Sequence, residues 1–286
     1  MTFLWTLLAL GLAVLGLDRL VESMYRYPRR PHDVTPQADG IPFQELSIPA
    51  AQGGHLYAWW IPGAPNAPTL VLVHGWARNL GRMRPYIRAL HSMGYNLLAF
   101  DARNHGSSSP LKRPTVATFA EDVLSAVEFV LGGGQTDSPS LGVVGLSVGG
   151  GAAIDAAGWD PRIQSVVTVG AISHPVAVMR HEFRKRHVPG FVARFLLAYM
   201  RLRFGLDFDR IAPMNNIGQA EAHIFLIHGE KDETIPLEQA QALAAAGREG
   251  KVQLWIVPGK GHSDCHTHPQ FWEKVQAFLD RTLPAP

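Results

Sequence analysis

The sequence predicts an α/β fold in which a mostly parallel sheet of eight strands carries helices on both faces. Short apolar runs rich in β-branched residues alternate along the chain with longer stretches of helical periodicity. Most of these runs lack polar alternation, which is typical of strands buried on both faces. The expected strands are 43–48, 55–61, 69–73, 95–100, 141–144, 163–169, 223–227 and 252–257, and the expected helices are 82–93, 116–131, 148–158, 237–246 and 269–283.

The order of these elements indicates how the strands pair. The first two strands flank Gly53-Gly54, a turn signal, and are expected to form an antiparallel pair. From residue 69 onward strands alternate with helices, and strands joined by a helix are usually parallel neighbours. The alternation is broken once, at 171–219, where a connection of this length indicates a functional insertion such as a helical lid.

The insertion at 171–219 is both basic and apolar. Between His174 and Arg210 it carries eight Lys or Arg residues and three acidic ones, although the whole chain has a net charge of only +2. Apolar side chains lie among these charges, namely Phe191, Phe195, Leu196, Leu197, Tyr199 and Met200. This is the composition of a solvated helical cap with ordinary surface arginines. It also fits a basic amphipathic lid that rests on anionic lipid or admits an anionic, apolar substrate.

The first residues form a separate segment. Residues 1–17 carry no charged side chain and reach the short end of the length that spans a bilayer. No basic residue precedes this run and no clear cleavage site follows it, so we favour an uncleaved anchor over a signal peptide. A modest excess of basic residues follows, with Arg19, Arg26, Arg29 and Arg30 against Asp18 and Glu22. By the positive-inside rule, the remainder of the chain would be cytoplasmic.

The composition limits both the domains and the partners. We expect a membrane anchor helix at 1–20, a Pro-rich linker at 21–42 and one α/β domain at 43–286. The low net charge leaves no surplus of Lys and Arg for a nucleic-acid-binding face. The single cysteine, Cys265, excludes an intrachain disulfide and a Cys-based zinc site. The cluster around it fits no standard zinc spacing, so no metal or organic cofactor is expected; its members are His262, Asp264, Cys265, His266 and His268.

The strongest chemical signal is the pentapeptide Gly145-Leu146-Ser147-Val148-Gly149. It matches G-x-S-x-G, follows the strand expected at 141–144 and precedes a helix that starts with small residues. A sharp strand-to-helix turn of this kind exposes the serine hydroxyl at its apex. The sequence therefore predicts Ser147 as a nucleophile.

A serine hydroxyl needs a general base, and the base needs an orienting acid. In open α/β sheets the reactive groups lie on loops after the carboxyl ends of strands. Two such loops carry candidates: 228–236 follows one strand, and 258–264 follows the next. The candidate acids are Glu230, Asp232, Glu233 and Asp264, and the candidate base is His262.

Five motifs together resemble the α/β-hydrolase superfamily over about residues 40–283. They are HGW (74–76), FDARNHGSS (100–108), GLSVGG (145–150), HGEKDETIP (228–236) and GKGHSD (259–264). The branch most resembled contains membrane-anchored serine hydrolases related to acylglycerol lipases, lysophospholipases and serine aminopeptidases. The resemblance implies that Ser147 is the nucleophile, Asp232 the acid and His262 the base. It also implies an oxyanion hole formed by the backbone N–H groups of Trp76 and Val148.

The resemblance implies a serine hydrolase that cleaves carboxylic esters through an acyl-enzyme and needs no cofactor. The apolar N-terminus and the basic insertion favour lipid-like acyl esters as its small-molecule substrates. Two alternatives stay open, a serine aminopeptidase-like peptidase and a non-catalytic binding protein on the same fold. Three further polar residues in the motifs, His74, Asp101 and His105, are interpreted as loop-bracing side chains.

Overall fold

The computed structural model describes residues 2–133, 135–136 and 138–283. Its strands are β1 (Gln44–Pro49), β2 (His55–Ile61), β3 (Thr69–Val73), β4 (Asn96–Phe100), β5 (Leu141–Leu146), β6 (Ser165–Val169), β7 (His223–Gly229) and β8 (Val252–Val257). Its α-helices are α1 (Thr2–Met24), α2 (Arg84–Ser92), α3 (Val116–Gly132), α4 (Val148–Trp159), α5 (Pro175–Lys185), α6 (Gly190–Phe204), α7 (Pro213–Asn216), α8 (Leu237–Ala246) and α9 (Phe271–Thr282). Short 3₁₀ helices lie at Pro36–Asp39, Leu80–Met83, Ile217–Gln219 and Cys265–Thr267.

The strands form one sheet in the order β1-β2-β4-β3-β5-β6-β7-β8. The first two pairings, β1 with β2 and β2 with β4, are antiparallel, and every later pairing is parallel. The expected eight-stranded, mostly parallel sheet is thus confirmed. Because β5, β6, β7 and β8 are successive parallel neighbours, the loops after their carboxyl ends all emerge at the same edge of the sheet.

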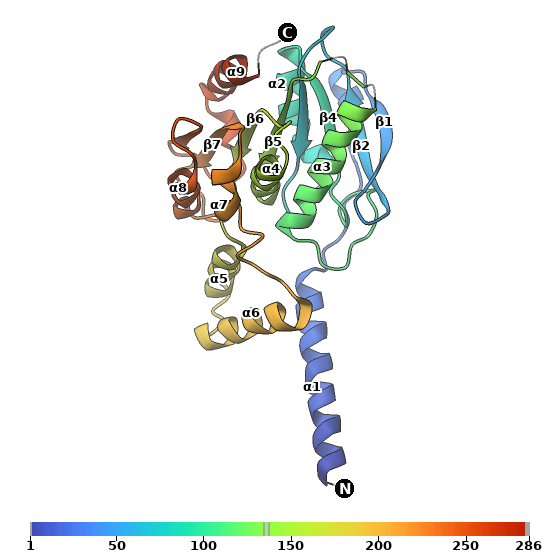
Figure 1. The fold of residues 1–286 in the computed structure, drawn as a ribbon, viewed down its shortest axis with the longest axis vertical. Coiled ribbons are helices and arrows are strands. Elements are labelled where there is room, and N and C mark those ends of the chain that lie inside the picture. The colour runs from blue at the N-terminus through green and yellow to red at the C-terminus, as the bar shows by residue number, and fades with distance from the viewer. Residues whose placement is uncertain (1, 134, 137, 284–286) are drawn as a thin grey trace.

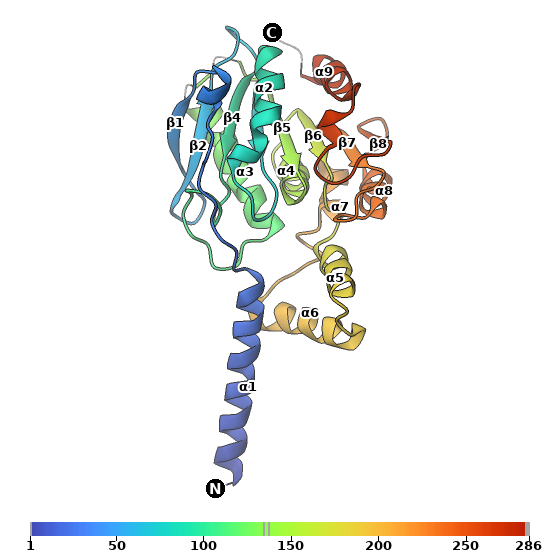
Figure 2. The same ribbon diagram turned by 180° about the vertical axis from the view of Figure 1, so that it is seen from behind.

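Helices cover both faces of the sheet. In Figures 1 and 2, α3 and α4 lie over one face, and α2 and α9 lie over the other. The sheet separates two apolar cores, one on each face, and alternate residues of β3 enter them. Val71 and Val73 pack with α3 and α4, whereas Leu70 and Leu72 pack with α2 and α9. Burial on both faces explains why central strands such as β3 and β4 read as continuous apolar runs.

One expected helix starts differently from the prediction. The segment expected as a helix at 82–93 begins with the 3₁₀ turn Leu80–Met83, and α2 follows from Arg84. The side chain of Asn79 accepts a hydrogen bond from the N–H of Gly81 and so caps the turn. This cap adds a tight turn ahead of the helix, and the apolar periodicity alone does not reveal it.

The insertion between β6 and β7 is helical and contains α5, α6 and α7. It has a small apolar core of its own, which includes Phe183 of α5 and Leu196 and Met200 of α6. Val21 of α1 belongs to the same core. Figures 1 and 2 show α6 running crosswise to α1, beside the end of α1 that leads into the body.

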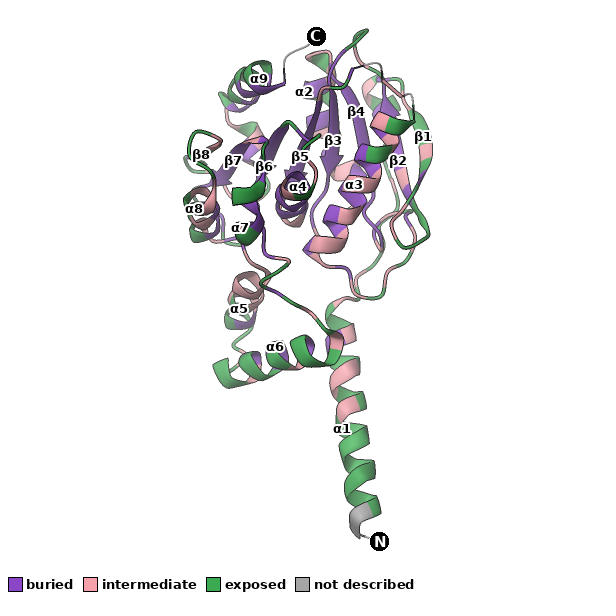
Figure 3. Cartoon of the chain, in the orientation of Figure 1, coloured by how far each residue is buried: buried purple, intermediate pink, exposed green. Residues whose placement is uncertain are grey.

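The helix α1 projects away from the body, and the N- and C-terminal ends lie at opposite ends of the molecule (Figure 1). Among the described residues it is the one helix long and apolar enough to cross a membrane, with a mean hydropathy of 1.8 over Leu4–Met24. Figure 3 shows its outer part exposed and the part next to the body partly covered. By length and composition, such a helix serves either as a membrane anchor or as a signal sequence.

Candidate active site

Ser147 lies on the turn between β5 and α4, with a left-handed φ of 56° and a ψ of −121°. Few non-glycine residues adopt this conformation, and where they do it is held by the surrounding structure. The N–H of Ser147 donates to the carbonyl of Val169 at the end of β6, at 2.9 Å. The side chain is half-buried at the carboxyl edge of the sheet. This is the strand-turn-helix geometry that the G-x-S-x-G motif predicts.

Asp232 and His262 lie in contact on the loops that follow β7 and β8. His262 Nδ1 is 2.7 Å from Asp232 Oδ2, and the Asp232 side chain is fully buried. The other carboxylate oxygen accepts hydrogen bonds from the N–H groups of Thr234 and Ile235, at 2.9 and 2.8 Å. Burial alone would raise the pKa of Asp232, but the hydrogen bond and charge of His262 outweigh it and hold that pKa below its usual value. The carboxylate is therefore ionised and fixed in place beside the imidazole.

Two of the rival carboxylates named from the sequence have other partners. Glu230 accepts from the N–H of Gly259, and Asp264 accepts from the N–H of Gly261. Both contacts shape the loop that carries the histidine. Among the described residues, Asp232 is the one carboxylate that bonds to His262.

Gly170 lies between the nucleophile turn and the acid–base pair. It follows Val169, the residue that accepts from Ser147, and its own φ is +62°. A Cβ at this position would lie 2.9 Å from His262 Nδ1 and 3.3 Å from Asp232 Oδ2. Only glycine leaves this space free, and the close approach brings His262 towards the turn of Ser147. Within the described residues, neither Ser147 Oγ nor His262 Nε2 has a hydrogen-bond partner, so both atoms are available to a substrate.

The loop after β3 carries the first of the two predicted oxyanion donors. The conformation of Ala77 is strained, with φ 54°, and its N–H donates to His105 Nε2 at 3.1 Å. Burial lowers the pKa of His105 to about 3, so its ring is neutral and Nε2 can accept. In the described part of the chain, the N–H groups of Trp76 and Val148 have no acceptor. Both are therefore free to donate to an oxygen that becomes negative.

His74 and Asp101 brace this loop. His74 Nε2 accepts from the N–H of Ala102 at 3.0 Å, so the proton lies on Nδ1, which is 2.8 Å from the carbonyl of Gly75. Burial lowers the pKa of His74 and keeps it neutral. Asp101 is fully buried and accepts from the N–H of Leu80 at 2.7 Å. These contacts agree with the loop-bracing interpretation of both side chains.

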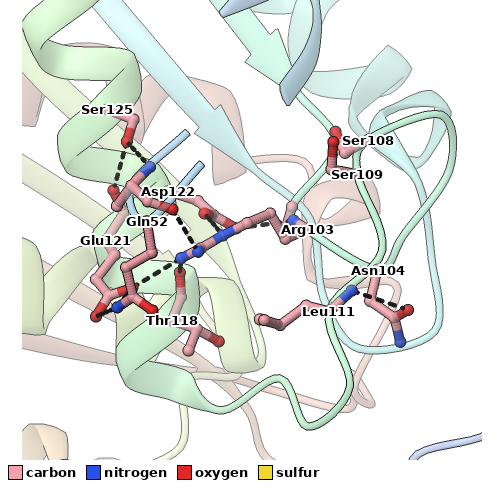
Figure 4. Close-up of polar contacts among 12 residues, drawn as sticks. Gln52, Arg103, Asn104, Ser108, Ser109, Leu111, Thr118, Glu121, Asp122 and Ser125 are labelled. Carbon is pink, nitrogen blue, oxygen red and sulfur yellow. Dashed lines mark hydrogen bonds and ion pairs between the residues drawn. The ribbon is translucent and has the colours of Figure 1, made fainter. Parts of the chain in front are cut away.

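Arg103 ties the loop after β4 to α3 (Figure 4). Its side chain is buried and forms ion pairs with Asp122 and Glu121. The distance between the Arg103 guanidinium and the Glu121 carboxylate is 2.7 Å. It also donates to the carbonyl of Ala51, in the turn between β1 and β2, at 2.8 Å. The network fixes the loop that carries His105 and therefore supports the Trp76 loop indirectly.

The expected lack of a metal site stays a prediction. Among the described residues, no group of three or more His, Cys, Asp or Glu side chains is arranged to hold a metal ion. Cys265 is buried, and its Sγ is 3.5 Å from the carbonyl of Gly261. Burial raises the pKa of this thiol to about 12, so it is protonated and unreactive.

Two residues of the site are not predicted by any motif. Gly170 gives one usable signal, since a glycine directly after a buried strand often marks a close approach of two segments. Tyr27 gives none, because it lies in a Pro-rich stretch without periodicity. Its ring packs edge-on against Trp76, with 5.3 Å between ring centroids.

Both the sequence and the fold resemble those of known hydrolases. A sequence model of the alpha/beta hydrolase fold matches residues 68–197. The Pyrococcus furiosus esterase Pf2001 has a similar structure, with a TM-score of 0.75 and 24% identity over 90% of this chain and 97% of the esterase. The chain has the α/β-hydrolase fold. A puromycin-hydrolyzing peptidase of Mycobacterium tuberculosis shares this fold, with a TM-score of 0.71 and 18% identity over 86% of this chain and 40% of the peptidase.

Curated relatives of this chain extend over most of its length. The uncharacterized protein YfhR of Salmonella typhimurium is 26% identical over 270 residues, which is 90% of this chain and 86% of YfhR. The human alpha/beta hydrolase domain-containing protein 17B is 23% identical over 235 residues, which is 82% of this chain and 74% of the human protein. The fold does not fix the reaction, since esterases and peptidases share it.

Proposed function

We propose that this chain is a serine hydrolase that cleaves carboxylic esters through a Ser147–His262–Asp232 triad. The observation that supports it most directly is the 2.7 Å hydrogen bond between His262 and the buried Asp232. It lies beside Gly170, the residue next to the hydrogen-bond acceptor of Ser147. These contacts support a triad in which the nucleophile, the base and the orienting acid come from the loops after β5, β8 and β7.

Acylation begins when Ser147 Oγ attacks the ester carbonyl carbon and His262 Nε2 takes the hydroxyl proton. Asp232 holds the proton of the resting imidazole on Nδ1, which leaves Nε2 free to act as the base, and stabilises the imidazolium that forms. The N–H groups of Trp76 and Val148 donate to the carbonyl oxygen as it becomes negative. Each such donor contributes about 3 kcal/mol to the lowering of the barrier. The alcohol then leaves with the proton from His262, and the acyl group stays on Ser147.

Deacylation repeats the same steps with water. His262 takes a proton from the water, the hydroxide oxygen attacks the acyl carbon, and the ester bond to Ser147 breaks. The serine oxygen recovers its proton from His262, and the carboxylic acid departs. Apart from the water and the ester, every step uses groups of this chain.

We further propose that the substrates are lipid-like acyl esters and that α1 holds the enzyme on a membrane, with the body on the cytoplasmic side. α6 supports this, because it lies against α1: the Tyr199 hydroxyl donates to Asp18 Oδ1 at 2.6 Å, and Arg203 pairs with Asp18. Phe195 and Leu202 of α6 are 55% and 86% exposed although they are apolar. A helix with exposed apolar residues and several arginines, next to a membrane-crossing helix, suits the lipid–water interface.

The test is the hydrolysis of p-nitrophenyl esters of increasing acyl length by the full chain in detergent. We expect Ser147→Ala to lower kcat by about 10⁴-fold or more, because the nucleophile is lost. Ser92→Ala, at the end of α2, is the matched control and should retain full turnover. The acyl length with the highest kcat/KM reports the depth of the acyl pocket.

Other outcomes would redirect the assignment. Turnover that survives Ser147→Ala would remove Ser147 as the nucleophile. If no ester is cleaved, the same variants are assayed with aminoacyl amides, since a peptidase shares the fold. Inactivity on both substrate classes would leave the non-catalytic binding protein.

A further inference from the structure

We propose that the segment 25–32, here called the stem, holds the oxyanion loop 75–77 in its working geometry and is thus a positioning element of the active site. The stem joins α1 to the body. The inference rests on the proposed role of the Trp76 N–H. The inference goes beyond that role because it makes the stem, which connects α1 to the body, a support of the active site.

The stem packs directly on Trp76. The ring of Tyr25 meets Trp76 edge-on at 6.1 Å between centroids, and the ring of Tyr27 does so at 5.3 Å. His105 and Phe119 of the body enclose the same indole, at 5.6 and 6.3 Å. Trp76 is therefore enclosed by two rings of the body and two rings of the stem. Removing the stem would open one side of this enclosure.

Tyr27 also contacts the residue that fixes Ala77. Its ring lies 4.8 Å from the His105 ring, and its hydroxyl oxygen is 3.3 Å from His105 Nδ1. Asn104 donates to the same hydroxyl oxygen at 3.3 Å. Because His105 Nε2 accepts from the N–H of Ala77, the tyrosine stabilises the orientation of the ring that holds the strained loop. A loop in a strained conformation keeps it only while its neighbours do.

The rest of the stem is bound to the two loops that flank the site. Arg29 donates to the carbonyls of Gly106, at 2.9 Å, and Ser108. The side chain of Asn79, four residues after Gly75, donates to the carbonyls of Arg30 and Pro31 at 3.0 and 2.7 Å.

His32 ends the stem in the same polar network. Its Nε2 is 2.7 Å from Asp101 Oδ2, and Asp101 Oδ1 accepts from the N–H of Leu80. The stem thus reaches both ends of the segment that runs from the oxyanion loop to Leu80. These contacts join residues 40 to 80 positions apart in the sequence, which is more than a flexible connection would make.

The opposite end of the stem is fixed by the insertion. Val21, in the last turns of α1, is fully buried among apolar residues of α5 and α6, and Tyr25 packs at the edge of that cluster. Lys112 pairs with Glu22 at 2.7 Å, which ties the end of α1 to the loop before α3. The stem is therefore held at both ends, and its position is coupled to that of α6.

The test compares amide hydrogen exchange in the full-length wild type, Tyr27→Ala and Tyr27→Phe, all in the same detergent. We expect peptides that cover residues 74–80 to exchange at least about threefold faster in Tyr27→Ala. Tyr27→Phe keeps the ring on Trp76 but loses the hydroxyl next to His105, so its exchange rate should lie between those of the wild type and of Tyr27→Ala. Peptides that cover 228–236 should be unchanged in both variants, because the stem makes no described contact with that loop.

Kinetics on a soluble ester separate positioning from general destabilisation. We expect Tyr27→Ala to lower kcat about 10- to 100-fold with KM within twofold, and Tyr27→Phe to retain most of the turnover. Tyr95→Ala is the matched control, since it also removes a packed tyrosine ring, but at the opposite edge of the sheet. It should lower the melting temperature without changing exchange at 74–80 or kcat. If Tyr27→Ala does not fold, Tyr27→Leu replaces it.

The outcomes are distinct. Equal exchange at 74–80 in wild type and Tyr27→Ala overturns the inference. Equal loosening of the 74–80 and 228–236 peptides also overturns it, and so does faster exchange at 74–80 with wild-type kcat. Failure of the proposed function shows instead as a wild type that cleaves no ester. In that event the exchange at 74–80 still decides whether the stem holds the loop.

Discussion

The sheet body and the part of the molecule next to α1 are built in different ways. In the body, the candidate residues Ser147, Asp232 and His262 follow β5, β7 and β8, which are parallel strands of one sheet, so strand order puts their loops at the same edge. Next to α1, the stem, α5 and α6 are joined by side-chain packing and by polar contacts between segments far apart in the sequence. The first arrangement follows from the topology, and the second depends on particular residues. Substitutions should therefore affect the two regions in different ways.

After the loss of the nucleophile itself, the largest effect is expected in the body, from Gly170→Ala. The added methyl group would meet His262 Nδ1 at 2.9 Å in a backbone of positive φ. A displacement of this kind costs about 100-fold in kcat. Ester hydrolysis by the purified variant is the measurement.

The control for this substitution is Gly250→Ala. Gly250 has a φ of 76°, and a methyl group added there would have no heavy atom within 4 Å. It therefore introduces the same backbone strain without the collision. If Gly250→Ala loses as much turnover as Gly170→Ala, strain rather than contact with His262 explains the loss, and the geometric argument fails.

A second prediction concerns the boundary between the two regions. Asp155 of α4 is buried, its Oδ1 accepts from Asn216 of the insertion at 2.7 Å, and its Oδ2 has no partner among the described residues. Burial raises the pKa of Asp155 to about 8, and the Asn216 hydrogen bond offsets this only in part. The folded state thus keeps a proton that the unfolded state releases above a pKa of 3.8. Stability should fall as the pH rises from about 4 to about 8, by up to about 1.4 kcal/mol per pH unit for one proton.

Asp155→Asn removes this titration and keeps the shape of the side chain. We expect the variant to match the wild type near pH 4 and to be more stable at pH 8, as measured by urea unfolding at both values. Parallel pH dependences in the two proteins would show that Asp155 is not protonated in the folded state.

The smallest effect is expected next to α1, from Phe195→Ser combined with Leu202→Ser. Both side chains are exposed, so the fold loses little. If they enter the lipid interface, turnover of a long-chain ester in anionic vesicles should fall about 3- to 10-fold, which corresponds to about 1 kcal/mol. Turnover of a soluble short-chain ester should not change. Trp159→Ser, an exposed aromatic at the end of α4, is the control and should alter neither activity.

The body could be predicted in detail from the sequence because its signals are local. The runs at 69–73 and 252–257 predicted strands with the bounds that the structure has. β3 is fully buried and is a continuous apolar run, whereas β8, at the end of the sheet, is only partly buried and was indicated by its β-branched and aromatic residues. The motif around Ser147 predicted the strand-to-helix turn, because its small residues are those that fit a turn this sharp. Asp232 could be chosen among its neighbours only through the resemblance, and its contact with His262 joins residues 30 positions apart.

The region next to α1 could not be predicted in the same way. Tyr25 and Tyr27 contact Trp76 across about 50 residues, and nothing in a Pro-rich stretch indicates such a partner. Nothing in the sequence indicates the left-handed conformation of Ala77 either, since alanine seldom adopts it unless neighbouring residues hold it there. Helical periodicity predicted an insertion with apolar residues, but which of them face α1 depends on tertiary packing.

The burial of Cys265 makes this protein well suited to distance measurements by spectroscopy. The single native thiol is protonated and shielded from solvent, so it would not react with a maleimide or methanethiosulfonate label under mild conditions. Cysteines introduced in pairs on α1 and α6 would then carry the only labels. The native residue need not be replaced, and the separation of the two helices can be followed directly in lipid.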